Sequence, residues 1–345
     1  MKAAILIESK KPLLVEQVNM PKNIEFGQVL VKVLYSGICG AQLNEIDAIK
    51  GEDKFLPHLL GHEGSGIVEK IGKGVKTVKV GDHVVMHWRP SSGIQSSTAE
   101  YSWNGKKLNA GWVTTFNEKA VVSENRLTVI PNNFDMKIAA LFGCAVTSGF
   151  GAVNNDAKLQ IGQSALIFGL GGMGLSISYA ASLSSAFPIV GVDIHKDKLN
   201  LAKKFGVTHS FLSNSDNFEK KIDNIFENKG PDVVFETTGN SKMMEKAYEL
   251  TPNHGKTVFV GVPNDKISLY TLPLAFNKSL LVSHGGQSIP DVDIPRYIRL
   301  VKNNKINFDN LITDEFKLDD VNKAIDLFRT GKAGRIIIKM NEENL

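Results

Sequence analysis

The pattern of hydrophobic and polar positions divides the chain into two parts. Up to about residue 145, short β-branched runs separated by glycines predominate, with no sustained helical period. Short strands joined by closely spaced glycine turns predict a mostly-β barrel or sandwich. The expected strands are Ala3–Ile7, Val29–Leu34, Gly66–Ile71, Asp82–Met86, Lys119–Val122 and Leu127–Ile130. The polar stretch from Arg89 to Gly111 has no clear period and predicts a long loop.

From about residue 160, apolar strand candidates alternate with helix-length amphipathic segments. This alternation predicts a parallel sheet covered on both faces, and six such strands match a complete doubly wound Rossmann sheet. The predicted strands are Ala165–Phe168, Ile189–Val192, His209–Leu212, Val233–Glu236, Val258–Gly261 and Leu280–Ser283. The predicted helices are Gly172–Leu183, Asp197–Phe205, Asn217–Glu227 and Ser241–Leu250, followed by Ile294–Lys302, Leu318–Thr330 and the strand Arg335–Met340. The fold class is therefore α/β, with a Rossmann sheet beside a barrel-like domain.

A glycine loop follows the first strand of the predicted Rossmann sheet. Its sequence is Gly169-Leu170-Gly171-Gly172-Met173-Gly174, a G-x-G-x-x-G that opens a helix. In dinucleotide-binding domains the first glycine permits a tight turn, the second admits a pyrophosphate, and the third packs helix on strand. Asp193 follows about 20 residues later, where a carboxylate accepts hydrogen bonds from ribose hydroxyls and repels a 2′-phosphate. We expect NAD rather than NADP; a glycine-rich turn in another α/β domain is the alternative.

Composition narrows the class of protein. The 345 residues predict roughly two domains, and 42 % hydrophobic with 22 % charged residues excludes collagenous and disordered chains. The net charge of +4 is too dispersed for a nucleic-acid partner. No run approaches the length of a membrane helix, and Ala3–Ile7 is too short for a signal-peptide core. With two cysteines and no export signal, a cytoplasmic protein without membrane partners is expected.

Hydride transfer to a nicotinamide requires a group that polarises the substrate oxygen, and zinc is one such group. The candidate ligands are Cys39, His62 and Cys144, which are scattered over more than a hundred residues. Their spacing forms no compact metal motif. Taken alone, the spacing favours the ordinary explanation over zinc, because free cysteines are usually small buried hydrophobic residues.

The residues around these candidates resemble the zinc-dependent medium-chain alcohol dehydrogenase family. The matching segments are Ser36-Gly37-Ile38-Cys39-Gly40, Gly61-His62-Glu63-Gly64 to Val68, Val80-Gly81-Asp82-His83-Val84, Leu141-Phe142-Gly143-Cys144-Ala145, the Gly169–Gly174 loop with Asp193 and Lys198, and Val260-Gly261-Val262-Pro263. The resemblance runs in order from about residue 1 to 340. It implies a chaperonin-10-like catalytic domain of residues 1–147 and 285–345, and an NAD-binding Rossmann domain of residues 148–284.

The resemblance also implies roles for individual residues. Cys39, His62 and Cys144 would bind a catalytic zinc, with Glu63 as a nearby or transient ligand. The cofactor-binding set is Gly169, Gly171, Gly172, Met173, Gly174, Asp193, Lys198 near the adenosine ribose, Val260, Val262, Arg335 at the pyrophosphate, and Ser148 near the nicotinamide. Trp88 falls where relatives place an aromatic residue in the substrate pocket, although ordinary core packing explains it equally well.

The sequence departs from this family at two places. No cysteine lies between Cys39 and Cys144, so the structural zinc of many relatives is not expected, and one zinc per chain is. The usual hydroxyl, aspartate and histidine after the first zinc cysteine are replaced by Ala41, Gln42 and Asn44. The substrate proton would then leave through water, a ribose hydroxyl or a side chain such as His87. A polyol or sugar derivative would supply its own relay through a vicinal hydroxyl.

We therefore expect a zinc- and NAD-dependent dehydrogenase that interconverts a small-molecule alcohol with an aldehyde or ketone. Two other classes compete with it: a zinc-free reductase of activated double bonds, and a non-catalytic binding protein on a dehydrogenase scaffold. The outer strand Leu280–Ser283 is an apolar edge that invites pairing. Relatives pair this edge across a two-fold axis, which implies a homodimer or a dimer of dimers.

Overall fold

A computed structural model describes residues 1–340 except 216 and 264. The chain divides into two compact units. Unit 1 combines Met1–Cys144 with Ile289–Leu345, and unit 2 is Ala145–Ser288.

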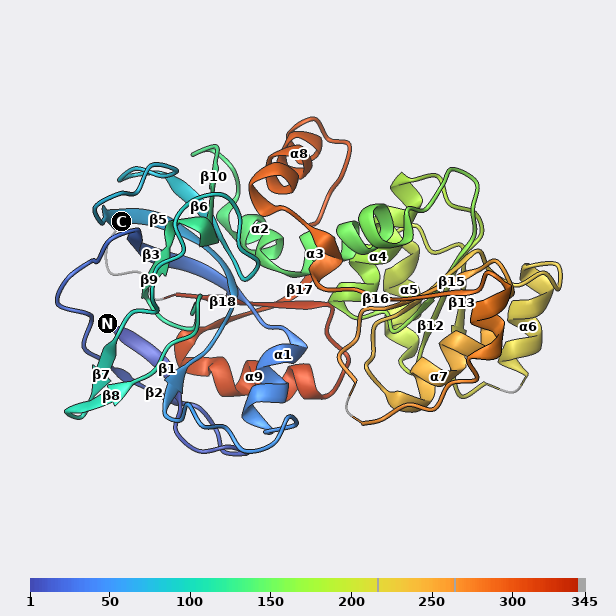
Figure 1. Cartoon of the computed structure of the whole chain (residues 1–345), viewed down its shortest axis with the longest axis horizontal. Coiled ribbons are helices and arrows are strands. Elements are labelled where there is room, and N and C mark those ends of the chain that lie inside the picture. The colour runs from blue at the N-terminus through green and yellow to red at the C-terminus, as the bar shows by residue number, and fades with distance from the viewer. Residues whose placement is uncertain (216, 264, 341–345) are drawn as a thin grey trace. The chain divides into compact units, whose positions relative to one another are not determined.

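Unit 1 is built mainly from β-strands (Figure 1). Its larger sheet has the order β10-β6-β5-β3-β18-β17, with β9 also paired to β3, and a smaller sheet has the order β2-β1-β4. The elements of its first segment are β1 (Lys2–Leu6), β2 (Leu14–Gln17), β3 (Gln28–Gly37), α1 (Gly40–Ile46), β4 (His58–Leu59), β5 (Glu63–Ile71), β6 (His83–His87), β7 (Tyr101–Trp103), β8 (Lys106–Leu108), β9 (Lys119–Ser123), β10 (Leu127–Ile130), α2 (Met136–Ala140) and η2 (Leu141–Gly143). Its second segment contains α8 (Pro290–Lys302), β17 (Ile312–Lys317), α9 (Val321–Arg329) and β18 (Arg335–Lys339).

The core of unit 1 joins both of these segments. Alternate residues of β3, among them Val29, Val31 and Val33, are buried, as the period of a strand requires. They share one cluster with Ile336 and Ile338 of β18. Because β18 pairs antiparallel with β3, the start of the last strand lies beside the end of the third.

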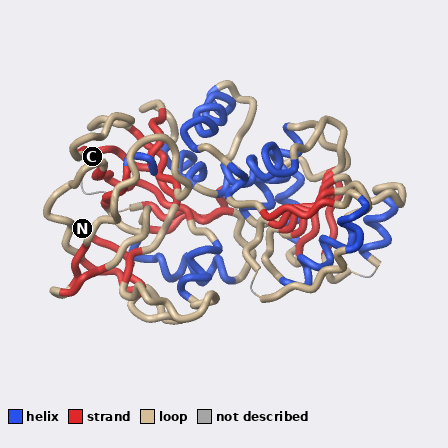
Figure 2. Tube along the Cα trace, in the orientation of Figure 1, coloured by secondary structure: helices blue, strands red, loops and turns tan. Residues whose placement is uncertain are grey.

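Unit 2 contains the predicted parallel sheet, in the order β13-β12-β11-β14-β15-β16. Every pairing in it is parallel, and helices lie on both faces of the sheet (Figure 2). This is the order of a complete dinucleotide-binding sheet, so the Rossmann prediction is confirmed. The elements are α3 (Ala145–Gly151), η3 (Ala152–Ala157), β11 (Ala165–Phe168), α4 (Gly172–Leu183), β12 (Ile189–Asp193), α5 (Lys196–Lys203), β13 (His209–Leu212), α6 (Phe218–Ile225), β14 (Val233–Glu236), α7 (Ser241–Leu250), β15 (Lys256–Phe259), η4 (Leu272–Phe276), β16 (Ser279–Val282) and η5 (Gly285–Gln287).

Some elements differ from the prediction. Helix α1 has seven residues, too few to display a helical period in the sequence. Helix α8 begins at Pro290 rather than Ile294, because a proline is favoured in the first helical turn and Asp291 and Asp293 there favour the helix dipole. Strand β15 begins and ends two residues before the predicted Val258–Gly261.

The stretch from Arg89 to Gly111 is not an unstructured loop, because it contains the hairpin β7–β8. Side chains of residues 124–126 form hydrogen bonds with the beginning of this stretch and with Trp88 just before it. Glu124 accepts a hydrogen bond from the Ile94 backbone N–H at 2.8 Å, and the Arg126 guanidinium donates to Gln95 Oε1 and to the Trp88 carbonyl. These contacts join distant residues, so no local pattern reveals them.

No single helix among the described residues is long and apolar enough to cross a membrane. One bent pair of helical segments, Met136–Gly143 and Ala145–Ala157, is long and apolar enough to do so, judged by length and composition alone.

Candidate functional site

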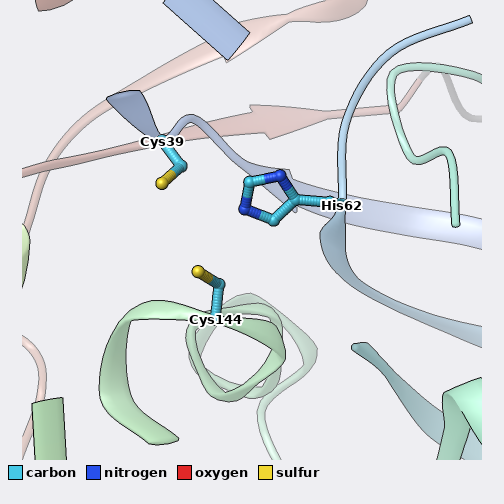
Figure 3. Close-up of side chains that lie close together, drawn as sticks. All are labelled: Cys39, His62 and Cys144. Atoms are coloured by element: carbon cyan, nitrogen blue, oxygen red, sulfur yellow. The ribbon is translucent and has the colours of Figure 1, made fainter. Parts of the chain in front are cut away.

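Three segments of unit 1 bring Cys39, His62 and Cys144 together. Cys39 lies between β3 and α1, His62 immediately precedes β5, and Cys144 follows η2. One potential ligand atom from each residue lies within 4.8 Å of the other two. Figure 3 shows both sulfur atoms and the imidazole ring pointing toward a common centre. The spacing of these residues in the sequence gives no hint of this geometry, which the sheet order creates.

Two glycines allow the segments to approach this closely. A Cβ on Gly143 would collide with the Met86 carbonyl and lie 2.7 Å from Glu63 Cβ, so glycine lets the turn before Cys144 lie against β5. A Cβ on Gly37 would lie 2.9 Å from a guanidinium nitrogen of Arg335. Glycine at the end of β3 therefore leaves room for a charged side chain behind Cys39.

The electrostatics favour a thiolate at Cys39. A hydrogen bond with Cys144 lowers the pKa of the Cys39 thiol, and this outweighs burial, which raises it. The nearby His62 ring and the Arg335 guanidinium lower this pKa further. The thiolate is the form of cysteine that ligates a metal. The group therefore supplies a ready anionic ligand.

The His62 ring is held in a fixed orientation. Its Nδ1 lies 2.6 Å from Nε2 of Gln42, a residue that is 1 % exposed. Its Nε2 is buried and has no hydrogen-bond partner within the described part of the chain. Buried polar atoms are nearly always satisfied, so an orphan imidazole nitrogen beside two thiols calls for a missing partner. Two cysteine sulfurs and one imidazole nitrogen with a free fourth position are the donor set of a catalytic zinc site.

Glu63 and Arg335 form a buried ion pair behind this group. Their exposed fractions are 0 % and 4 %, and the Arg335 guanidinium contacts the Glu63 carboxylate. Burial lowers the pKa of Arg335, whereas its contact with Cys39 raises it. Glu63 is not among the three residues whose ligand atoms cluster in the described structure. The roles expected for Glu63 as a transient ligand and for Arg335 at a pyrophosphate stay predictions.

The surroundings of His87 weigh against the suggestion that it carries the substrate proton. The ring is 1 % exposed, with Nδ1 2.7 Å from the Arg89 carbonyl and Nε2 3.0 Å from Thr128 Oγ1. Burial lowers its pKa to about 4. Both ring nitrogens thus have partners inside the fold, and His87 joins β6 to β10.

Trp88 is half-buried, and the Arg89 guanidinium lies 5.8 Å from its ring centroid. Its backbone carbonyl accepts a hydrogen bond from Arg126. These contacts are compatible with a pocket wall and with packing, so its role in a substrate pocket stays a prediction.

In unit 2 the glycine loop has the three properties that dinucleotide binding requires. Gly169 has a φ of +85°, a backbone conformation that residues with a side chain rarely adopt. A Cβ on Gly174 would collide with the Gly169 carbonyl, so this glycine serves the packing of α4 on β11. A Cβ on Gly171 would meet only Lys198 Nζ, at 3.6 Å. The protein's own packing therefore does not require glycine at 171, whereas a pyrophosphate approaching the backbone does.

Asp193 and Lys198 lie beside this loop. The Asp193 carboxylate accepts hydrogen bonds from the backbone N–H groups of Leu170 at 2.7 Å and His195 at 2.9 Å. Burial lowers the pKa of Lys198, although the charge of Asp193 opposes this shift. One anionic and one cationic group thus flank the second glycine, as expected for a site that meets ribose hydroxyls and phosphate charge.

The other predicted cofactor residues lie at different places in unit 2. Met173 and Gly172 begin α4, Val260 follows β15, and Val262 is 50 % exposed two residues later. Ser148 is 3 % exposed within α3. No contact made by these residues identifies a ligand, and their roles stay predictions.

Gln42 has a structural role that the sequence reasoning missed. It is the third residue of α1, and its Oε1 accepts a hydrogen bond from the Cys39 backbone N–H at 2.8 Å, which closes a capping box. The sequence signal for this capping box is a glutamine three residues after Cys39, the residue that precedes the helix. A cysteine in the first position obscured it, since capping boxes normally begin with serine or threonine.

Comparison with known proteins places the whole chain in one family. The family model for the alcohol dehydrogenase GroES-like domain matches residues 25–132, and that for zinc-binding dehydrogenases matches residues 172–303. S-(hydroxymethyl)glutathione dehydrogenase of Paracoccus denitrificans is 31 % identical over 373 residues, covering 98 % of this chain and 99 % of that protein.

Solved structures agree with this assignment. Benzyl alcohol dehydrogenase from Acinetobacter calcoaceticus has a TM-score of 0.89 at 27 % identity, with 99 % of both chains covered. 2R,3R-butanediol dehydrogenase from Bacillus subtilis has a TM-score of 0.80 at 26 % identity, again with 99 % of both chains covered. The chain is therefore an oxidoreductase that belongs to the zinc-dependent medium-chain alcohol dehydrogenase family.

Proposed function

We propose that this protein oxidises an alcohol with NAD, using a single zinc ion bound by Cys39, His62 and Cys144. The observation that carries the proposal is that one potential ligand atom from each residue lies within 4.8 Å of the others, while His62 Nε2 has no hydrogen-bond partner among the described residues. When bound, zinc supplies a Lewis acid that polarises the substrate oxygen, and NAD accepts the hydride.

The chain's own residues prepare the metal site. Cys39 is held toward its thiolate form by Cys144, His62 and Arg335. The Arg335 guanidinium contacts the Glu63 carboxylate and lowers the pKa of the Cys39 thiol, so it offsets negative charge in this buried region. The proposal of a single zinc is supported by the cysteine count, because both cysteines of the sequence belong to this group.

The residues of unit 2 favour NAD over NADP. The Asp193 carboxylate lies at the end of β12, where it would accept hydrogen bonds from both ribose hydroxyls. The open space at Gly171 lets the N–H groups at the start of α4 reach a pyrophosphate, and Lys198 adds a positive charge beside them.

A substrate with a vicinal hydroxyl fits the chain best. Ala41 carries no hydroxyl, Asn44 does not titrate, and both nitrogens of His87 are already engaged. A second hydroxyl on the substrate would carry the proton outward in place of these side chains. The structural neighbours are named for both classes, a diol in Bacillus subtilis and benzyl alcohol in Acinetobacter calcoaceticus, so the diol proposal rests on the side chains named above.

The direct test is a screen of vicinal diols, sugar alcohols and matched monohydric alcohols with NAD, followed at the nicotinamide absorbance band. We expect NADH to form with a diol, and no turnover by Cys144→Ala. In a parallel assay that supplies NADH and an α,β-unsaturated ketone, reduction of the double bond by both proteins would instead support a zinc-free reductase. Binding of NAD without turnover of any substrate class would support a binding protein.

We also propose a homodimer, or a dimer of dimers, formed through β16. This strand ends the order of the parallel sheet, and its Val282 is 72 % exposed. An apolar edge strand is protected by pairing. Light scattering at micromolar concentration should give at least twice the 37.7 kDa mass of the chain, and a monomer would contradict this pairing. A cytoplasmic location is proposed because a reducing compartment keeps both thiols available to the metal.

A further inference from the structure

The Gln42 side chain has two partners, one on each polar atom of its amide. Its Oε1 accepts the Cys39 N–H at 2.8 Å and closes the capping box of α1. Its Nε2 lies 2.6 Å from His62 Nδ1. At 1 % exposure, the amide has no solvent with which to exchange these partners freely.

This arrangement determines where His62 carries its proton. An amide nitrogen donates and does not accept, so Nδ1 must offer its lone pair to Gln42. A neutral imidazole has one N–H, which is then on Nε2. Nε2 is the nitrogen that has no hydrogen-bond partner among the described residues and shares a centre with the thiols in Figure 3.

Metal binding requires the opposite arrangement. A histidine that binds zinc through Nε2 has its proton on Nδ1 and donates it to an acceptor. The Gln42 oxygen can become that acceptor only if the amide turns over. The Cys39 N–H then faces an NH₂ group, and the capping box opens. One acceptor oxygen cannot serve two N–H donors on opposite sides of the amide.

We propose that Gln42 makes zinc loading compete with the capping of α1, so that this site holds zinc less tightly than the same three ligands with a carboxylate at position 42. A glutamate has two acceptor oxygens and almost the same shape. It would serve the Cys39 N–H and the His62 Nδ1–H together. Gln42 is thus a positioning residue that keeps the metal exchangeable, and the inference rests on the proposed zinc ligands.

The test measures zinc affinity of the full-length protein by competition with a chromophoric chelator at neutral pH. We expect Gln42→Glu to bind zinc about 10- to 100-fold more tightly than the unmodified protein, the range by which the partners of metal ligands alter affinity. Asn44→Asp is the matched control, since it adds the same charge to α1 two residues away. Unchanged or weaker binding in Gln42→Glu, or an equal gain in Asn44→Asp, would overturn the proposal.

A second readout does not require Gln42→Glu to fold. Long-range ¹H–¹⁵N correlations of the metal-free protein should show the His62 proton on Nε2, and zinc should move it to Nδ1, with the signal assigned by its loss in His62→Asn. A metal-free Nδ1–H tautomer would overturn the proposal. If Cys144→Ala leaves zinc affinity unchanged, the proposed ligand set itself fails, which is a different result from either of these.

Discussion

The glycine loop of unit 2 and the metal-ligand group of unit 1 are built in opposite ways. The loop is one contiguous strand–turn–helix, and its chemistry lies in backbone N–H groups, a positive φ at Gly169 and a space at Gly171. The metal group consists of side chains from three separate segments, aligned by the sheet order and supported by Gln42 and Arg335. The loop therefore depends on the absence of side chains, whereas the metal group depends on the identity of each one and of its neighbours.

Removal of one metal ligand should have the largest effect, and it tests whether the two regions act independently. We expect Cys144→Ala to abolish turnover and to lower the zinc content well below one per chain, because two of three ligands do not hold the ion. NAD affinity should be unchanged, since the cofactor residues of unit 2 are untouched. Calorimetric titration with NAD checks this separation; parallel loss of zinc and NAD binding would show that the two regions are not independent.

Restoring a hydroxyl beside the metal ligands tests the substrate-supplied relay. Ala41→Ser should raise kcat/KM for a monohydric alcohol by up to about 10²-fold, the lower end for a positioned proton-transfer group. It should change the value for a vicinal diol little, because that substrate carries its own relay. Equal responses of the two substrates, with zinc content constant, would mean that Ala41 instead makes room for a bulky substrate.

The choice of cofactor tests the charge at the end of β12. Asp193→Gly should narrow the preference for NAD over NADP by about tenfold, or about 1.4 kcal/mol, because it removes the repulsion of a 2′-phosphate. Asp193→Asn is the comparison variant: it removes the charge and keeps one of the two carboxylate oxygens that accept the Leu170 and His195 N–H groups. Equal NAD and NADP affinities in the unmodified protein would show that Asp193 does not meet the ribose.

Substitutions at the second and third glycines of the G-x-G-x-x-G motif, Gly171 and Gly174, should separate NAD binding from folding stability. Gly171→Ala should weaken NAD binding about fivefold, or about 1 kcal/mol, with little change in Tm, since its Cβ meets only Lys198 Nζ. Gly174→Ala should instead cost about 1–3 kcal/mol of folding free energy, because its Cβ collides with the Gly169 carbonyl. Thermal melts with and without NAD measure both effects, and a destabilised Gly171→Ala would contradict this division.

The contrast between the two regions also explains what the sequence could predict. The Rossmann strands Ala165–Phe168 and Val233–Glu236 were predicted with their observed bounds, because buried parallel strands are continuous apolar runs. Residue type alone makes Cys39, His62 and Cys144 no more than candidate ligands; the motifs around them carry the resemblance to the dehydrogenase family. Helix α1 and the link from Gln42 to His62 escaped prediction because one is too short for a period and the other joins residues 20 apart. The burial of His87 likewise depends on the pairing of β6 with β10, which no local pattern specifies.

The most direct test of the central claim is X-ray absorption at the zinc edge of the purified protein, with the metal content determined on the same sample. The account predicts one zinc per chain, with two sulfur ligands at about 2.3 Å and one imidazole nitrogen at about 2.0–2.1 Å. This shell corresponds to Cys39, Cys144 and His62. A shell of nitrogen and oxygen without sulfur, or a second tightly bound zinc per chain, would contradict it.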